Sequence, residues 1–300
     1  MLVAGGTDLI PNLKRRQFDP EILVQVPALT GIEPEEGGGL RLGATVTLSE
    51  AADHSALNAS FRGFAEAAGQ VSSPPLRNAG TLGGNLCVDT RCNYYNQSYE
   101  WRMAAGFCMK KDGDICLVAP GSSRCWAISS SDTAPMALVL DAMITLAGPD
   151  GERRLPAAAL YQDDGIDYLA KLPHEVVTAI SLPAPDGVRS AYVKVRRRPS
   201  IDFPLAGAAV ALRFDGDVVT ACRIALTAVA SHPLEVPAAG EFMVGKRIEE
   251  ETLEAVAELA AKPARPLDNA DLAHTWRKKM VRHAVREAIL RAAGRGSSGT

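Results

Sequence analysis

Five of the six cysteines in this 300-residue chain lie between Cys87 and Cys125, and the sixth is Cys222. Thiolate sulfur is soft and polarisable, and four converging thiolates satisfy a cubane iron–sulfur cluster or a tetrahedral zinc ion equally well. In a reducing cytoplasm such a group favours a bound metal over disulfides. The cysteines therefore predict a metal centre in residues 87–131.

The spacing of the cysteines bears on the choice of metal. Structural zinc sites usually take ligands from CxxC pairs, whereas the steps from Cys92 to Cys108, Cys116 and Cys125 are 16, 8 and 9 positions. Iron–sulfur is thus favoured. Zinc stays an alternative, and so do free or structural cysteines, although several exposed thiols on one irregular segment would be open to oxidation.

The remaining cysteines and the basic residues nearby are assigned separately. Cys87 directly follows a glycine loop and is expected to pack rather than to act as a fifth ligand, although spacing alone leaves this open. Cys222 lies in an apolar strand segment and is expected to be a core residue. The basic residues beside the cysteines would offset the negative charge of a thiolate-ligated cluster, with solvated loop charge as the alternative. They are Arg91, Lys110, Lys111 and Arg124.

Two glycine loops form the second chemical signal. The segments are AGGTDL at 4–9 and NAGTLGGNL at 78–86, each with Thr and Gly placed so that backbone amides can approach a phosphate. Two such loops suit a pyrophosphate. Neither matches GxGxxG or GxxxxGK[ST], so the Rossmann and P-loop interpretations lose their usual support. Tight turns without a ligand are the alternative.

Composition limits the classes of function. The chain has 47% hydrophobic and 22% charged residues and a formal charge of -3, which indicates a globular protein with no electrostatic reason to bind nucleic acid or an anionic membrane. Apolar runs stay well below the roughly 20 residues of a membrane span, and no secretory signal stands out, so the cytoplasm is expected. The five histidines are scattered and no Ser/His/Asp or Cys/His arrangement is recognisable.

The elements that would position these residues are mixed. Strand and helix patterns alternate irregularly before residue 87 and after residue 131, whereas 87–131 has no periodicity. The segment 183–188, PAPDGV, predicts a linker. Beyond it we expect a hairpin turned at Asp215-Gly216 and helices near 248–262 and 271–293. The last helix is expected to bury a stripe at helical spacing, namely Leu272, Trp276, Met280, Ala284 and Ala288.

Four motifs together resemble a known family. AGGTDL, RNAGTLGGN, SDTAP, and YVKVRRR with a following Asp202 resemble the FAD-binding medium subunits of the molybdenum hydroxylases, which include xanthine dehydrogenase and carbon monoxide dehydrogenase. The resemblance covers nearly the whole chain. The cysteine-bearing insertion is not general in that family, but it resembles that of the 4-hydroxybenzoyl-CoA reductase β subunit, including the segment CVDTRCNYYNQS.

The resemblance implies a fold class and a set of site residues. The fold would be α+β, a two-subdomain FAD-binding domain of the vanillyl-alcohol-oxidase/PCMH type over 1–184 with the iron–sulfur insertion at 87–131, and a smaller α+β domain over 185–300. The implied FAD-diphosphate residues are Gly5, Gly6, Thr7, Asp8, Thr81, Gly83, Gly84 and Asn85. The implied 4Fe-4S ligands are Cys92, Cys108, Cys116 and Cys125.

Four further residues are implied to touch the cofactor. Asp132 would contact the adenosine half of FAD, with a helix N-cap as its alternative or additional role. Val71 and Val177 would supply apolar contacts, and Lys194 would reach the cofactor from the C-terminal domain. A strand lysine facing solvent is the alternative for Lys194.

The resemblance also implies partners and a role. A large molybdopterin subunit and a small 2Fe-2S subunit would complete an oxidoreductase in which this chain transfers electrons, with ferredoxin or NAD as the external carrier. The leading substrate is an aromatic acyl-CoA, and the alternatives are an aldehyde or N-heterocycle complex, a zinc-stapled nucleotide-binding scaffold, and a self-sufficient NAD(P)H flavin reductase. The family normally has a strand and a helix before the first glycine loop. In this sequence Met1 lies only three residues before that loop, as expected if the start is truncated or misassigned.

Overall fold

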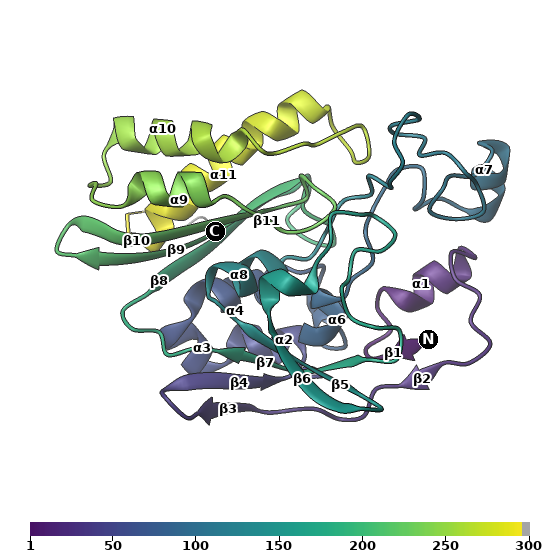
Figure 1. Ribbon diagram of the computed structural model, residues 1–300, viewed down its shortest axis with the longest axis horizontal. Coiled ribbons are helices and arrows are strands. Elements are labelled where there is room, and N and C mark those ends of the chain that lie inside the picture. Colours follow the sequence, from purple (N-terminus) through teal and green to yellow (C-terminus); the bar gives the residue numbers. More distant parts are fainter. Residues whose placement is uncertain (296–300) are drawn as a thin grey trace.

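Two antiparallel sheets and the helices around them make up the body of the protein in the computed structural model, which describes residues 1–295 (Figure 1). The first sheet has the strand order β3-β4-β7-β5-β6. Its strands are β3 Ile32–Glu35, β4 Gly39–Gly43, β5 Met143–Gly148, β6 Gly151–Pro156 and β7 Val176–Leu182. Leu42, Ile180 and Ile144 face one another across β4, β7 and β5 and are fully buried, so apolar cross-strand contacts fix the register.

Short helices cover one side of this sheet. They are α2 Leu48–Asp53, α3 Ser55–Ser60, α4 Arg62–Gly69, α5 Pro74–Arg77, α6 Leu82–Leu86 and α8 Thr133–Val139, and the 3-10 helix Ala157–Leu160 follows β6. A capping box starts α2, because Thr47 Oγ1 accepts from the Glu50 amide at 3.1 Å while the Glu50 carboxylate accepts from the Thr47 amide at 2.8 Å. Every residue of α8 is buried, because this helix lies between the two sheets.

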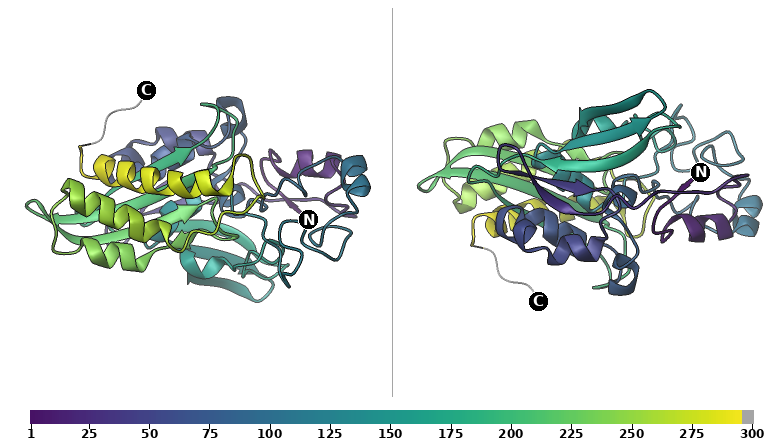
Figure 2. Two further views of the ribbon diagram at one scale, coloured as in Figure 1. Left: turned by 90° about the horizontal axis from the view of Figure 1, so that it is seen from above. Right: turned by 90° about the horizontal axis from the view of Figure 1, so that it is seen from below.

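The second sheet belongs to the C-terminal part of the chain and has the order β11-β10-β9-β8. Its strands are β8 Arg189–Val195, β9 Ala206–Asp215, β10 Val218–Thr227 and β11 Leu234–Glu235. The predicted hairpin joins β9 to β10, with Gly216 at φ +55° in its turn. The helices α9 Pro237–Met243, α10 Glu250–Ala261 and α11 His274–Ala292 cover the face that α4 and α8 leave open (Figure 2).

The stripe predicted for the last helix was wrong in its first half. Ala284 and Ala288 are fully buried, but Leu272 is 45% exposed and Trp276 is 37% exposed. The buried face is Arg277, Val281, Ala284, Val285, Ala288, Ile289 and Ala292. Steps of four residues advance about 40° beyond one turn, so a series of them leaves the core face.

Residues 87–131, called here the cysteine lobe, project at one end of the molecule beside helix α1, Leu9–Lys14 (Figures 1 and 2). The lobe is largely irregular, as predicted, and carries helix α7, Tyr99–Ala104. Arg102 of α7 donates to the carbonyls of Arg15 and Arg16 at 2.9 and 3.0 Å, and Gln17 donates to the Tyr95 carbonyl at 2.6 Å. These bonds fasten the lobe to the end of α1.

A short parallel pair, β1 Leu2–Val3 and β2 Val24–Gln25, frames α1. Across residues 1–295 there is no helix with the length and apolar content needed to cross a bilayer. The mixed helix and sheet content agrees with the α+β prediction. The division at 184/185 stays a prediction, although β7 ends at Leu182 and β8 begins at Arg189 with the predicted linker between them.

Candidate functional site

The two glycine loops pack directly against each other. A Cβ on Gly5 would overlap the carbonyl of Ala79 in the second loop, and Gly6 has φ +70°, which favours glycine. In the second loop a Cβ on Gly83 would lie 2.9 Å from the Ala44 Cβ. Thr81 caps α6 by accepting from the Gly84 amide at 3.1 Å. The glycines are therefore required by the close approach of two chain segments.

A cavity of about 260 Å³ opens beside these loops. Its lining comes from both glycine loops, the lobe and the C-terminal domain: Thr7, Asp8, Pro11, Arg15, Val71, Ser72, Leu76, Asn85, Arg91, Ser130, Asp132, Ile201, Asp202 and Phe203. A second cavity of about 260 Å³ adjoins it, sharing Arg15, Arg91, Ser130, Asp202 and Phe203, and reaches Cys92. The two adjoining cavities, called here the hollow, lie between the glycine loops and the cysteine lobe.

The predicted cofactor residues divide into those that line this hollow and those that do not. Thr7, Asp8, Val71, Asn85 and Asp132 line the first cavity. Directly behind them, in the same loops, lie Gly5, Gly6, Thr81, Gly83 and Gly84. Val177 lies elsewhere, in β7 within the main core, where it pairs with Leu146.

One lining atom is suited to a polar ligand. Within residues 1–295 the buried Oγ of Ser130 has no hydrogen-bond partner, and Ser130 lines both cavities. A buried polar atom without a partner costs free energy, so a bound group with a donor or acceptor would satisfy it. Together with the glycine cradle, Ser130 makes the hollow a chemically suitable site for a dinucleotide such as FAD.

Asp132 and Lys194 contact each other rather than standing apart. Lys194 Nζ lies 2.8 Å from Asp132 Oδ2 and donates to the Gln70 carbonyl at 2.9 Å, while the Tyr192 hydroxyl donates to Asp132 Oδ1 at 2.7 Å. Burial raises the pKa of the Asp132 carboxyl, and the bonds from Lys194 and Tyr192 oppose that rise. Asp132 occupies the N-cap position of α8, but these bonds direct its carboxylate to β8. Lys194 is buried behind Asp132, so it neither faces solvent nor lines the hollow.

The four cysteines predicted as ligands converge inside the lobe. All are buried, and Cys92, Cys108 and Cys125 share a small apolar cluster with Tyr95 and Ala127. Burial is the main reason that the pKa of Cys92 is raised to about 12, and the charges of Cys125 and Cys108 contribute to that rise. Burial is likewise the main reason that the pKa of Cys125 is raised to about 11, and the charges of Cys116 and Cys108 contribute to that rise. Each of the four therefore lies within electrostatic reach of another.

Among residues 1–295, no three Cys, His, Asp or Glu side chains are close enough together to ligate one metal ion. The choice of an iron–sulfur cluster over zinc therefore stays a prediction from the cysteine spacing.

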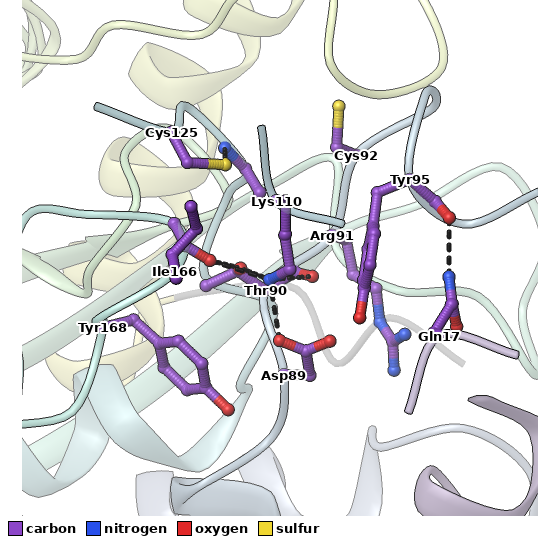
Figure 3. Close-up of polar contacts among 12 residues, drawn as sticks. Gln17, Asp89, Thr90, Arg91, Cys92, Tyr95, Lys110, Cys125, Ile166 and Tyr168 are labelled. Carbon is purple, nitrogen blue, oxygen red and sulfur yellow. Dashed lines mark hydrogen bonds and ion pairs between the residues drawn. The ribbon is translucent and has the colours of Figure 1, made fainter. Parts of the chain in front are cut away.

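Each basic residue beside the cysteines is paired with a carboxylate, and the charge of Lys110 also opposes the rise in the pKa of Cys125. Lys110 Nζ binds Asp89 at 2.7 Å and the Gly165 carbonyl at 2.7 Å, and it lies against the rings of Tyr95 and Tyr168 (Figure 3). The other pairs are Arg91–Asp8, Lys111–Asp112 and Arg124–Asp163. Their main effect is therefore to organise the lobe.

The remaining cysteines take the packing roles expected of them. Cys87 packs against the main core, and burial raises its pKa to about 11. Cys222 packs against the C-terminal core, and burial raises its pKa to about 12.

Several residues that line the two cavities were not predicted from the sequence. Ile201 and Ser72 have φ +67° and +46°, and the Ile201 amide donates to the Ser72 carbonyl at 2.9 Å, joining the two domains at the hollow. A β-branched residue with positive φ is strained, and the sequence gives no signal of that. Ser130 and Phe203 likewise carry no motif. Arg91 had a detectable signal, since it directly precedes a predicted ligand.

Comparisons with known proteins cover nearly the whole chain. Residues 1–185 match the model of the FAD binding domain in molybdopterin dehydrogenase, and residues 190–292 match the CO dehydrogenase flavoprotein C-terminal domain. The chain is 34% identical over 248 residues to the aldehyde oxidoreductase FAD-binding subunit PaoB of Escherichia coli (strain K12), covering 79% of this chain and 77% of that protein.

Two carbon monoxide dehydrogenases are also similar. The medium chain of the Hydrogenophaga pseudoflava enzyme is 29% identical over 300 residues, covering 97% of this chain and 90% of that protein. A crystal structure of a Cu,Mo-CO dehydrogenase superposes with a TM-score of 0.81 at 28% identity, covering 99% of this chain and 90% of the matched one. Sequence and structure comparisons thus agree along both domains.

Proposed function

This chain belongs to the FAD-binding medium subunits of the molybdenum hydroxylase and carbon monoxide dehydrogenase family, and we propose that it also holds a 4Fe-4S cluster and exchanges electrons between cluster and flavin. As a member of that family it is an FAD-binding subunit of an oxidoreductase. When bound, a flavin supplies two-electron chemistry and an iron–sulfur cluster supplies one-electron steps. The protein's part is to hold both groups close together.

The observation that carries the proposal is the position of the cysteine lobe. Cys92 lines the second of the two adjoining cavities, and Cys108, Cys116 and Cys125 are buried in the same lobe. Gly165 supports the arrangement, because a Cβ there would lie 2.7 Å from Cys125 Sγ. One proposed ligand therefore borders the cavity that adjoins the proposed flavin site, and the other three lie in the lobe behind it.

Within this function each residue set has a distinct task. Gly5, Gly6, Thr7 and Asp8, with Thr81, Gly83, Gly84 and Asn85, would hold the FAD diphosphate from two sides through the backbone amides of their loops, while Arg91 pairs with the Asp8 carboxylate. Val71 and Asp132 would contact the cofactor along the hollow. Lys194 would act through Asp132. Val177 is the least supported member, since it lies in the core of the first sheet.

The partners follow from the family. A large molybdopterin subunit would carry the substrate reaction, a small 2Fe-2S subunit would connect it to this chain, and ferredoxin or NAD would serve as external carrier. For the substrate, the relative at 34% identity favours an aldehyde. The aromatic acyl-CoA of 4-hydroxybenzoyl-CoA reductase rests on the cysteine insertion alone.

Metal analysis of purified full-length protein tests the proposal. We expect flavin absorbance and about four irons per chain. Single serine substitutions at Cys92, Cys108, Cys116 and Cys125 should each remove most of the iron, while FAD still binds at saturating concentration, because the glycine loops rather than the cysteines would hold it. C87S and C222S are matched controls and should keep both groups.

Other outcomes would favour the alternatives. Colourless protein that contains zinc would contradict the cluster and support a zinc-stapled scaffold. Iron retained after any of the four serine substitutions would contradict the ligand set. Bleaching of the flavin by NAD(P)H with no other subunit present would instead support a self-sufficient flavin reductase.

A further inference from the structure

Arg91 lies where the two cavities and the cysteine lobe meet. It lines both cavities, and its side chain is only 11% exposed. Its backbone is paired with Ile128 in both directions, each N–O distance being 2.8 Å. The position of this residue is therefore fixed by the backbone of the lobe, while its side chain reaches the hollow.

Arg91 and Cys92 point to opposite sides of this segment. Arg91 forms an isolated β-bridge, and successive side chains of extended backbone alternate between its two sides. The Cys92 sulfur points one way and the Arg91 guanidinium the other (Figure 3). The same short segment thus presents a proposed cluster ligand to the lobe and a positive charge to the first glycine loop.

The guanidinium belongs to a polar network at that loop. It forms an ion pair with Asp8 and donates to Asn12 Oδ1 at 3.4 Å, and Asn12 Nδ2 donates back to Asp8 Oδ2 at 3.2 Å. The ring of Phe203, from the C-terminal domain, lies 4.5 Å from the guanidinium carbon. Asn12 is fully buried, so the network is anchored in α1.

The charge of Asp8 gives this network a function. Asp8 lines the cavity in which the proposed function places the FAD diphosphate, and two like charges there would repel each other. Arg91 neutralises the carboxylate, and in a partly buried site that effect is stronger than in water. An uncompensated Asp8 would oppose the binding of an anionic group.

We propose that Arg91 is a positioning residue that couples the two cofactor sites, so that FAD binding at the first glycine loop orders the cysteine lobe and an ordered lobe favours FAD. The proposal rests on the proposed function for the identity of the anionic ligand. The coupling runs from Asp8 through the Arg91 guanidinium to the Arg91–Cys92 backbone.

FAD titration of the full chain, followed by flavin fluorescence after removal of the bound cofactor, tests the electrostatic part. R91Q should weaken FAD binding by roughly 5- to 150-fold, the usual span of coupling between sites. The double variant D8N/R91Q should bind FAD more tightly than R91Q, because the unpaired carboxylate is gone. R91K keeps the charge but loses the planar fork and should fall between R91Q and wild type.

The matched control is Arg62, an exposed residue paired with Glu66 at 3.0 Å on α4. R62Q should bind FAD like the wild type. If R91Q weakens FAD no more than R62Q does, or if D8N/R91Q binds no better than R91Q, the proposal is overturned.

Hydrogen–deuterium exchange with and without FAD tests the coupling and needs no metal. FAD should slow exchange of amides at 91–131 in the wild type and R62Q, but not in R91Q. Should R91Q not fold, R91K, which keeps the charge, takes its place and should show less FAD-dependent protection of the lobe than the wild type. Protection of the lobe in R91Q or R91K equal to that in the wild type would overturn the coupling. If the wild-type protein contains no iron, the proposed cluster is contradicted but the proposed coupling is not. The FAD-dependent protection of the lobe is measured without reference to the iron content.

Discussion

At the scale of single residues, Lys110 is the most connected charge of the cysteine lobe. Its side chain is 5% exposed and that of Asp89 is 9% exposed. Their ion pair joins the turn after Cys108 to the segment that follows the second glycine loop. Removing one member of a buried pair leaves the other charge without compensation.

We therefore expect K110M to destabilise the protein by about 3–5 kcal/mol in urea unfolding. For the proposed cluster, we expect metal analysis to find less iron in K110M than in the wild type. The neighbouring Lys111 is a matched control, because its side chain is 32% exposed in its pair with Asp112. K111M should change stability by less than about 1 kcal/mol. A K110M protein as stable as K111M would show that the pair is dispensable.

Individual residues were predictable from sequence where the chemistry demands a particular type. Glycine at positions 5 and 83 is required by close contacts, and the sequence pattern indicated both loops. The ion partners were not predictable. Arg91 pairs with Asp8, far away in the sequence, and Lys110 with Asp89, because tertiary packing brings those segments together. The sequence indicated only that these charges lie beside the cysteines, and their carboxylate partners come from distant segments.

At the scale of elements, the pair Arg153–Glu175 joins β6 to the turn that precedes β7. Both Glu175 oxygens accept from the Arg153 guanidinium, at 2.5 and 2.8 Å, and the Leu172 amide donates to the same carboxylate at 2.6 Å. The bond from Arg153 is the main reason that the pKa of Glu175 falls from 4.5 to about 2. The folded protein thus favours the ionised carboxylate.

The lowered pKa predicts a pH dependence of stability. A group with a depressed folded pKa contributes stability that is complete above its unfolded pKa, here 4.5, and is lost as pH falls through about 2. E175Q should therefore lower the Tm at pH 7, and the Tm difference from wild type should shrink as the pH falls below 4.5. The control E152Q, at an exposed position on β6, should show little difference. A Tm difference that does not change with pH would exclude the charge as its cause.

Element type was more predictable than element orientation. The alternating strands and the hairpin at Gly216 followed from side-chain patterns that act locally. The orientation of α11 did not follow from such a pattern, because its buried face includes Arg277. The guanidinium of Arg277 donates to the carbonyls of Leu205, Leu267 and Ala228. A buried arginine breaks the hydrophobic pattern from which a helix face is inferred.

At the scale of the whole molecule, the two domains are joined by polar and apolar contacts that sequence alone could not locate. The main core includes Tyr192, Ala209 and Ala225 of the second sheet, packed against the helices of the first domain. Motif resemblance predicted two domains and a cofactor between glycine loops. It could not predict that Asp132 and Lys194, from different domains, would bind each other.

That buried pair predicts how strongly the domains depend on each other. Asp132 is 2% exposed and the Lys194 side chain is fully buried, so K194M would leave a carboxylate with only the Tyr192 hydroxyl as partner. We expect a loss of about 3–5 kcal/mol in urea unfolding. Y192F removes one hydrogen bond and should cost about 1 kcal/mol.

The double variant D132N/K194M separates charge from packing. It leaves no buried charge, and the side-chain amide oxygen at position 132 can still accept from Tyr192, so the variant should recover much of the stability lost in K194M. If the double variant is as unstable as K194M, the lysine stem rather than its charge supports the interface. If K194M unfolds like the wild type, the contacts of α4 and α8 with the second sheet suffice to hold the domains together.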